Sequence, residues 1–146
     1  MKIFLSSGFI LIAVVAFPQN FMQPLDEWTI QVNNQFRHFE RELGLTSQSH
    51  NMIIGSLQDD AHSWVLIEME PGFTYKILGV CDHDCFNLDL ELYALTDDLL
   101  SSDYEADDFP LVSITPSVPS TYRLKVIMED CTDGPCRFGV NVYRLE

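Results

Sequence analysis

Two spacings of hydrophobic residues divide the chain near residue 50. Over residues 25–43 apolar side chains recur every three or four positions, which places them on one stripe of an α-helix that ends at Gly44. The stripe consists of Leu25, Trp28, Val32, Phe36, Phe39 and Leu43. Most amphipathic helices in soluble proteins cover their own core, so we expect this helix to pack on its own domain. The alternative is a structural subunit that docks through this N-terminal helix.

From residue 51 onward the spacing is that of β-strands. In Leu88-Asp89-Leu90-Glu91-Leu92 the leucines point to one face and the carboxylates to the other. Turn residues such as Pro71-Gly72 separate runs of this kind. The expected strands are 52–57, 64–69, 75–81, 88–94, a short one near Leu99, 111–115, 122–128 and 138–145. Because no helical pattern separates these runs, they predict a mainly-β fold, an antiparallel β-sandwich of about seven or eight strands preceded by one helix.

Residues 1–16 have the pattern of a secretory signal peptide. Lys2 precedes an uncharged apolar run that ends in small residues, and Val14 and Ala16 suit the subsites of signal peptidase, which predicts cleavage after Ala16. Pro18 ends the run before the roughly 20 apolar residues that a membrane span needs. We therefore expect a secreted or periplasmic protein, with no membrane association after cleavage, made of an N-terminal segment (17–50) and a sandwich domain (51–146).

Export has a consequence for the four cysteines, Cys81, Cys85, Cys131 and Cys136. An even number of cysteines in an oxidising compartment implies two disulfides. Three pairings are possible, and we favour the local one, because Asp133-Gly134-Pro135 is a turn sequence that can fold the second pair back on itself. Neither local pair can then lie within one extended strand.

Charge limits the classes of partner. The chain has 8 Lys and Arg against 22 Asp and Glu, a net charge of −14. Nucleic acids and anionic membranes bind through clustered cations, so neither is an expected partner. Aromatic residues make up 12% of the chain, which is enough for a core and argues against a disordered acidic tail.

The acidic residues concentrate between Lys76 and Arg123, where no other Lys or Arg occurs. The ten acids of this segment are Asp82, Asp84, Asp89, Glu91, Asp97, Asp98, Asp103, Glu105, Asp107 and Asp108. Calcium prefers oxygen ligands from carboxylates and loops. Asp82, Asp84, Asn87 and Asp89 form a candidate calcium site, with Asp103, Asp107 and Asp108 approaching from the next connection. A solvated acidic surface is the alternative, and no established calcium-loop signature is present.

The segment Cys81-Asp82-His83-Asp84-Cys85 also has the donor types of a zinc or copper site. Thiols outside the cytoplasm are oxidised first, so we favour the disulfide.

Catalytic motifs are missing from the sequence: no G-x-S-x-G elbow, H-E-x-x-H pair or P-loop occurs. We therefore expect a non-catalytic protein. A hydrolase that uses two carboxylates of the acidic segment is the alternative, and such a site also needs an aromatic-lined cleft. Whether Trp64, Phe73, Tyr93 or Tyr104 would line that cleft or lie in the core stays open.

One ordered series of motifs resembles a known family. The series is Gly55-Ser56-Leu57, the run 64–69, Pro71-Gly72-Phe73-Thr74-Tyr75, Asn87-Leu88-Asp89-Leu90-Glu91-Leu92-Tyr93, the run 112–115 and Ser120-Thr121-Tyr122-Arg123-Leu124-Lys125-Val126. Over about residues 52–145 it resembles the bacterial pre-peptidase C-terminal (PPC) domain, although Asn87 replaces the first Asp of the D-x-D-L motif and Ser120 stands where Gly is usual. The resemblance implies a jelly-roll-like β-sandwich of an exported protein. We expect a free-standing form that binds a protein or glycan partner.

Overall fold

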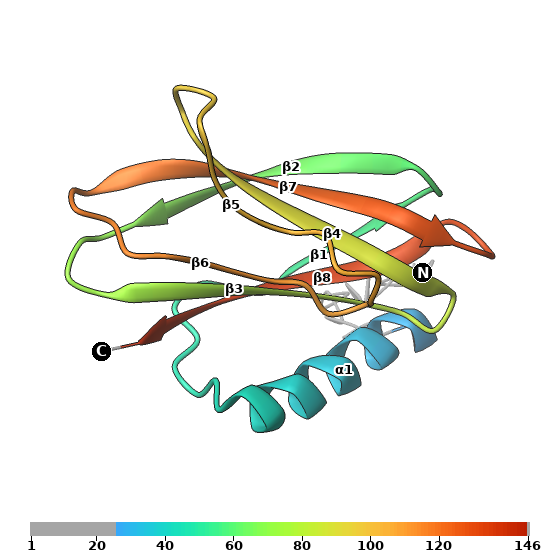
Figure 1. Cartoon of the computed structure of the whole chain (residues 1–146). Coiled ribbons are helices and arrows are strands. Elements are labelled where there is room, and N and C mark those ends of the chain that lie inside the picture. The colour runs from blue at the N-terminus through green and yellow to red at the C-terminus, as the bar shows by residue number, and fades with distance from the viewer. Residues whose placement is uncertain (1–25, 146) are drawn as a thin grey trace, which may run out of the picture.

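The computed structural model describes residues 26–145 (Figure 1). The proposed signal peptide and Leu25 lie outside these residues. Helix α1 spans Glu27–Leu43 and is capped at both ends by its own sequence. Asp26 accepts a hydrogen bond from the Thr29 amide through Oδ1 at 2.8 Å, and Gly44 adopts the left-handed conformation (φ 66°) while its amide donates to the Glu40 carbonyl. The predicted end of the helix at Gly44 is confirmed.

Eight strands form two antiparallel sheets of four strands each, which confirms the predicted β-sandwich preceded by a helix. The strands are β1 (Ile53–Leu57), β2 (Ala61–Met69), β3 (Thr74–Cys81), β4 (Cys85–Ala94), β5 (Leu99–Asp103), β6 (Leu111–Ile114), β7 (Ser120–Cys131) and β8 (Cys136–Leu145). Their order is β1-β8-β3-β6 in the first sheet and β2-β7-β4-β5 in the second. Consecutive strands often lie in different sheets, so the chain crosses repeatedly between the two layers (Figure 1).

The main core lies between the two sheets. Leu88, Leu90 and Leu92 of β4 are fully buried there, as their alternation with acidic residues predicts. They pack in one cluster with inward residues of the other strands, among them Ile77, Val112, Leu124, Val126, Met128 and Val140.

Helix α1 packs against the outer face of the first sheet, beside β3 and β8 (Figure 1). Val32 and Phe36 are buried there in a second cluster with Leu78, Val80 and Tyr143 of the sheet. The helix approaches closely because Gly139 has no side chain: a Cβ there would lie 2.6 Å from Phe36 Cε2 and from Val32 Cγ1. The expectation that the helix covers its own domain therefore agrees with the structure.

Two residues of the predicted apolar stripe are not buried against the sheet, which corrects the prediction at those positions. Trp28 and Leu43 are 42% and 38% exposed, whereas Thr29 is buried. Trp28 and Leu43 belong to the terminal turns of α1, outside the cluster that its middle forms with the sheet. Within residues 26–145, no helix has the length and apolar composition needed to cross a membrane.

Candidate functional site

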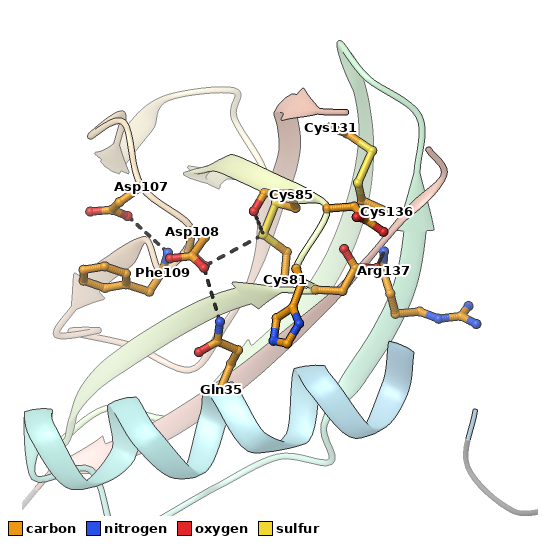
Figure 2. The surroundings of a disulfide bond; sticks show 12 residues. Gln35, Cys81, Cys85, Asp107, Asp108, Phe109, Cys131, Cys136 and Arg137 are labelled. Atoms are coloured by element: carbon orange, nitrogen blue, oxygen red, sulfur yellow. Dashed lines mark hydrogen bonds between the residues drawn. A yellow bond between two sulfur atoms is a disulfide. The ribbon is translucent and has the colours of Figure 1, made fainter. Parts of the chain in front are cut away.

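Both disulfides close connections that cross from one sheet to the other. Cys81 ends β3 and Cys85 begins β4, while Cys131 ends β7 and Cys136 begins β8. The Cα atoms of the two pairs are 5.9 and 6.0 Å apart. These are the local pairs that the sequence favours. Since β3 and β8 belong to one sheet and β4 and β7 to the other, the two bridges hold the sheets together at one end of the sandwich (Figure 2).

Hydrogen bonds join this disulfide end to the helix. The Thr132 amide donates to the carbonyl oxygen of Asp84 at 2.9 Å, which links the two bridged loops. The His83 amide donates to Gln31 Oε1 of α1 at 3.0 Å. Gln35 of α1 donates to Asp108 Oδ2 at 3.3 Å, as Figure 2 shows. These hydrogen bonds therefore connect the two bridged loops, helix α1 and the segment before β6.

Two of the four candidate calcium ligands, Asp82 and Asp84, belong to the disulfide end. Asp82 is buried, and its Oδ2 accepts a hydrogen bond from the backbone amide of Arg137 at 2.6 Å. Burial raises the pKa of Asp82, and the hydrogen bond from Arg137 opposes that rise. Asp84 lines a hollow together with Asp133 of the second bridged loop.

The other two, Asn87 and Asp89, lie on β4 beyond the bridged loop. Asp89 alternates with the core leucines and so faces the outside of the second sheet, yet its side chain is buried. Burial raises the pKa of Asp89 to about 6, and four neighbouring carboxylates, Glu129, Asp103, Glu91 and Asp107, raise it as well.

Oxygen Oδ1 of Asp82, of Asn87 and of Asp89 is buried in each case without a hydrogen-bond partner among the described residues. Even so, nowhere in residues 26–145 do three or more His, Cys, Asp or Glu side chains gather as a group that could hold a metal ion. The four predicted ligands are thus divided between two places, and calcium binding stays a prediction.

A second candidate site is the exposed outer face of the second sheet. His62, Trp64 and Leu66 of β2 point outward, and Trp64 and Leu66 are 44% and 67% exposed. In the register of the sheet Trp64 stands opposite Lys125 of β7, which stands opposite Glu91 of β4. We call this surface the Trp64 face; it consists of His62, Trp64, Leu66, Glu91, Tyr93, Arg123 and Lys125.

Aromatic rings and cations surround Trp64 on this face. The ring centroids of Trp64 and Tyr93 are 5.5 Å apart. The guanidinium carbon of Arg123 is 4.8 Å from the centroid of the Trp64 ring, and Lys125 Nζ is 5.9 Å from it. Cations at these distances are attracted to the indole ring. The indole is therefore held in place while almost half of it remains open to solvent.

Glu91 organises the polar groups of the Trp64 face. Its carboxylate accepts hydrogen bonds from the hydroxyls of Tyr93 at 2.7 Å and Tyr104 at 2.8 Å, and Lys125 Nζ lies 3.3 Å from Oε2. Burial raises the pKa of Glu91, but these three donors outweigh it and keep the pKa below its usual value. Arg123 forms an ion pair with Asp97. Rings and polar groups thus form a preorganised surface.

The sequence left open whether Trp64, Phe73, Tyr93 and Tyr104 line a cleft or lie in the core. Trp64 and Tyr104 are exposed, whereas Phe73 packs against the main core. The alternation of β2 indicated an outward Trp64, because Trp64 shares a side of the strand with His62 rather than with the inward residues Val65 and Ile67. It could not be used alone, because alternation separates two faces without telling which of them faces the core.

Comparisons of the chain with models of protein families and with curated proteins found no match.

Proposed function

We propose that this chain is an exported, non-catalytic β-sandwich module that binds a neutral glycan on the Trp64 face. The observation that carries the proposal is the indole of Trp64, which is fixed by its neighbours and yet 44% exposed on an outer sheet face. Large aromatic side chains dominate the energetics of binding surfaces because they bury much apolar area with few torsion angles to fix.

The chemistry of the face matches that of a pyranose. A sugar ring has an apolar C–H side, which can lie on the indole of Trp64 and the phenol ring of Tyr93, and a rim of hydroxyl groups. Glu91 can accept hydrogen bonds from such hydroxyls, while Arg123 and Lys125 can donate to them. A net charge of −14 disfavours an anionic polysaccharide, so the glycan is a neutral one.

Export and the family resemblance support the same role. Two disulfides are typical of proteins that fold in an oxidising compartment, which agrees with a signal peptide cleaved after Ala16. The PPC-like order of motifs over residues 52–145 is consistent with a free-standing, exported relative of these modules, and we propose that relationship on those motifs.

The test uses the two tryptophans of the chain as a matched pair. The variant Trp64→Ala should lose at least about tenfold in affinity for a retained polysaccharide, a loss expected for removing a central aromatic anchor. Trp28→Ala, which removes a similarly exposed indole from the first turn of α1, should bind like the unmodified protein. The measurement is gel retardation in a panel of soluble neutral polysaccharides. Equal binding by both variants, or no retardation by any member of the panel, would refute the proposal.

Calcium is the cofactor that we propose for this module, and the structure divides its candidate ligands into two testable groups. If the ion binds near Asp89 and Asn87, calcium should raise the midpoint of thermal unfolding and Asp89→Asn should abolish the rise. Asp84→Asn, at the other place, should leave it intact. A midpoint that does not move between millimolar calcium and chelator would contradict calcium binding.

One observation favours a hydrolase as a second candidate function. Asp89 and Glu91 are outward neighbours on β4, and their surroundings move the pKa of Asp89 up and that of Glu91 down, as in an acid and a base that share one reaction. Neither carboxylate lines any of four hollows on the surface of residues 26–145, however, and a glycosidase needs a cleft. Release of reducing sugar that both Asp89→Asn and Glu91→Gln abolish, with unchanged melting, would establish this candidate in place of the non-catalytic one.

A further inference from the structure

A hollow of about 330 Å³ lies at the disulfide end of the sandwich, apart from the Trp64 face. Its walls come from five parts of the chain: the first turn of α1 with Trp28, β1 with Ser56, the β3–β4 loop with Asp84, the β7–β8 loop with Asp133, and the beginning of β8 with Arg137. We call it the inter-loop pocket.

The side chains of this pocket have the chemistry that recognises an organic cation. Trp28 contributes an aromatic ring that is 42% exposed, and Asp84 and Asp133 contribute two carboxylates. The one cation in the lining, Arg137, is paired with a carboxylate outside it, because its Nη2 lies 2.8 Å from Asp26 Oδ2. The charge left for a ligand is therefore negative, next to an aromatic ring that attracts cations.

Covalent bonds and hydrogen bonds fix both carboxylate-bearing walls. Asp84 lies inside the loop closed by Cys81–Cys85, and Asp133 lies inside the loop closed by Cys131–Cys136. The hydrogen bond from the Thr132 amide to the Asp84 carbonyl joins the two loops. The two carboxylates are thus held in position before a ligand binds, so binding would cost the protein little conformational entropy.

We propose that the inter-loop pocket binds the cationic side chain of a Lys or Arg residue of a protein partner. The volume accommodates one long side chain rather than a folded element, and the charge of −14 attracts a basic partner. The ammonium or guanidinium group lies between the carboxylates of Asp84 and Asp133, and the aliphatic stem lies along the indole of Trp28. This site does not depend on glycan binding at the Trp64 face.

Because the chain has two tryptophans, removing one of them lets fluorescence report on the inter-loop pocket and on the Trp64 face separately. In Trp64→Phe the remaining indole, Trp28, reports on the inter-loop pocket, and in Trp28→Phe the remaining indole, Trp64, reports on the other face. The probe is a short peptide with three lysines and capped ends. We expect a saturable fluorescence change in Trp64→Phe, none in Trp28→Phe, and none in either variant with the same peptide after acetylation of its lysines.

A matched pair of charge variants separates pocket binding from general attraction to an acidic protein. Asp133→Asn in the Trp64→Phe background should weaken binding about tenfold, as expected for the loss of one charge-assisted contact. Asp98→Asn removes the same charge from the exposed turn between β4 and β5 and should change the affinity less than about twofold. Equal losses in the two variants, an equal response to the acetylated peptide, or no saturable response of Trp28 would overturn the proposal. Both aspartates are exposed, so circular dichroism should show unchanged folding.

Discussion

The two sheets of this sandwich have similar inner faces but very different outer faces. The outer face of the first sheet presents Leu78, Val80 and Tyr143 to helix α1 and is buried. The outer face of the second sheet presents Trp64 and Leu66 to solvent. A covered apolar face contributes its buried area to folding, whereas an uncovered face contributes little, and its exposed indole is the one for which we propose a binding role.

The difference is visible in the burial of the strands. In β3, and through most of β8, consecutive residues are buried on both sides, while β2 and β7 alternate between buried and more exposed positions. A strand of the first kind needs a further layer on its outer side, and α1 supplies it. A strand of the second kind leaves its outer residues free for other roles.

The largest expected loss of stability comes from removing a buried side chain between α1 and the first sheet. Phe36→Ala should lower the free energy of unfolding by about 3–4 kcal/mol, because it leaves a cavity between α1 and the sheet. Leu66→Ala, on the uncovered face, should change it by less than about 0.5 kcal/mol. Urea unfolding of both variants provides the measurement, and equal effects would show that the two outer faces do not differ energetically.

The next effect concerns the end where the two sheets are linked. Replacing Cys131 and Cys136 together by Ser should lower the free energy of unfolding by about 2 kcal/mol, since the bridge closes only a short loop of the unfolded chain. The same double replacement of Cys81 and Cys85 provides the comparison. Chemical unfolding without reductant measures both, and an unchanged midpoint would mean that the bridges do not constrain the fold.

The third effect depends on pH and belongs to the uncovered sheet. The pKa of Asp89 is about 6 in the folded protein, above its ordinary value of 3.8, so the folded state holds its proton more tightly than the unfolded chain does. This residue therefore destabilises the fold progressively as pH rises from about 4 to about 6, and the cost persists above that window.

Asp89→Asn should consequently raise the free energy of unfolding by about 1–2 kcal/mol at neutral pH and by almost nothing near pH 4. Urea unfolding at both pH values measures the effect, with Asp98→Asn as the exposed control. A gain that is the same at both pH values would rule out the titration of Asp89 as its cause.

The smallest expected loss of stability is at Trp64, the residue for which we propose a binding function. Trp64→Ala should cost less than about 1 kcal/mol of stability, because the indole is 44% exposed and its contacts with Arg123 and Lys125 are surface cation–π pairs. Thermal unfolding checks this. A larger loss would assign Trp64 a structural role and would weaken the comparison between the two faces.

Most of the secondary structure was predictable from the chain. The stripe around Val32 and Phe36 predicted the helix, and the alternation of Leu88, Leu90 and Leu92 predicted the core side of β4. The candidate calcium ligands were not predicted to separate. Asp82 and Asp89 are close in sequence, but the chain crosses between sheets at Cys81–Cys85, so Asp82 meets the backbone of β8 while Asp89 faces outward from the second sheet.

The sequence by itself determined the order of helix and strands and the alternation within each strand, and its turn residues favoured the local one of three cysteine pairings, because these features depend on neighbouring residues. The tertiary structure alone decided which outer face the helix covers, that two local disulfides connect two sheets, and that Trp64 contacts both Arg123 and Tyr93. These features depend on contacts between segments that are distant in the chain, and periodicity carries no information about which of those segments meet.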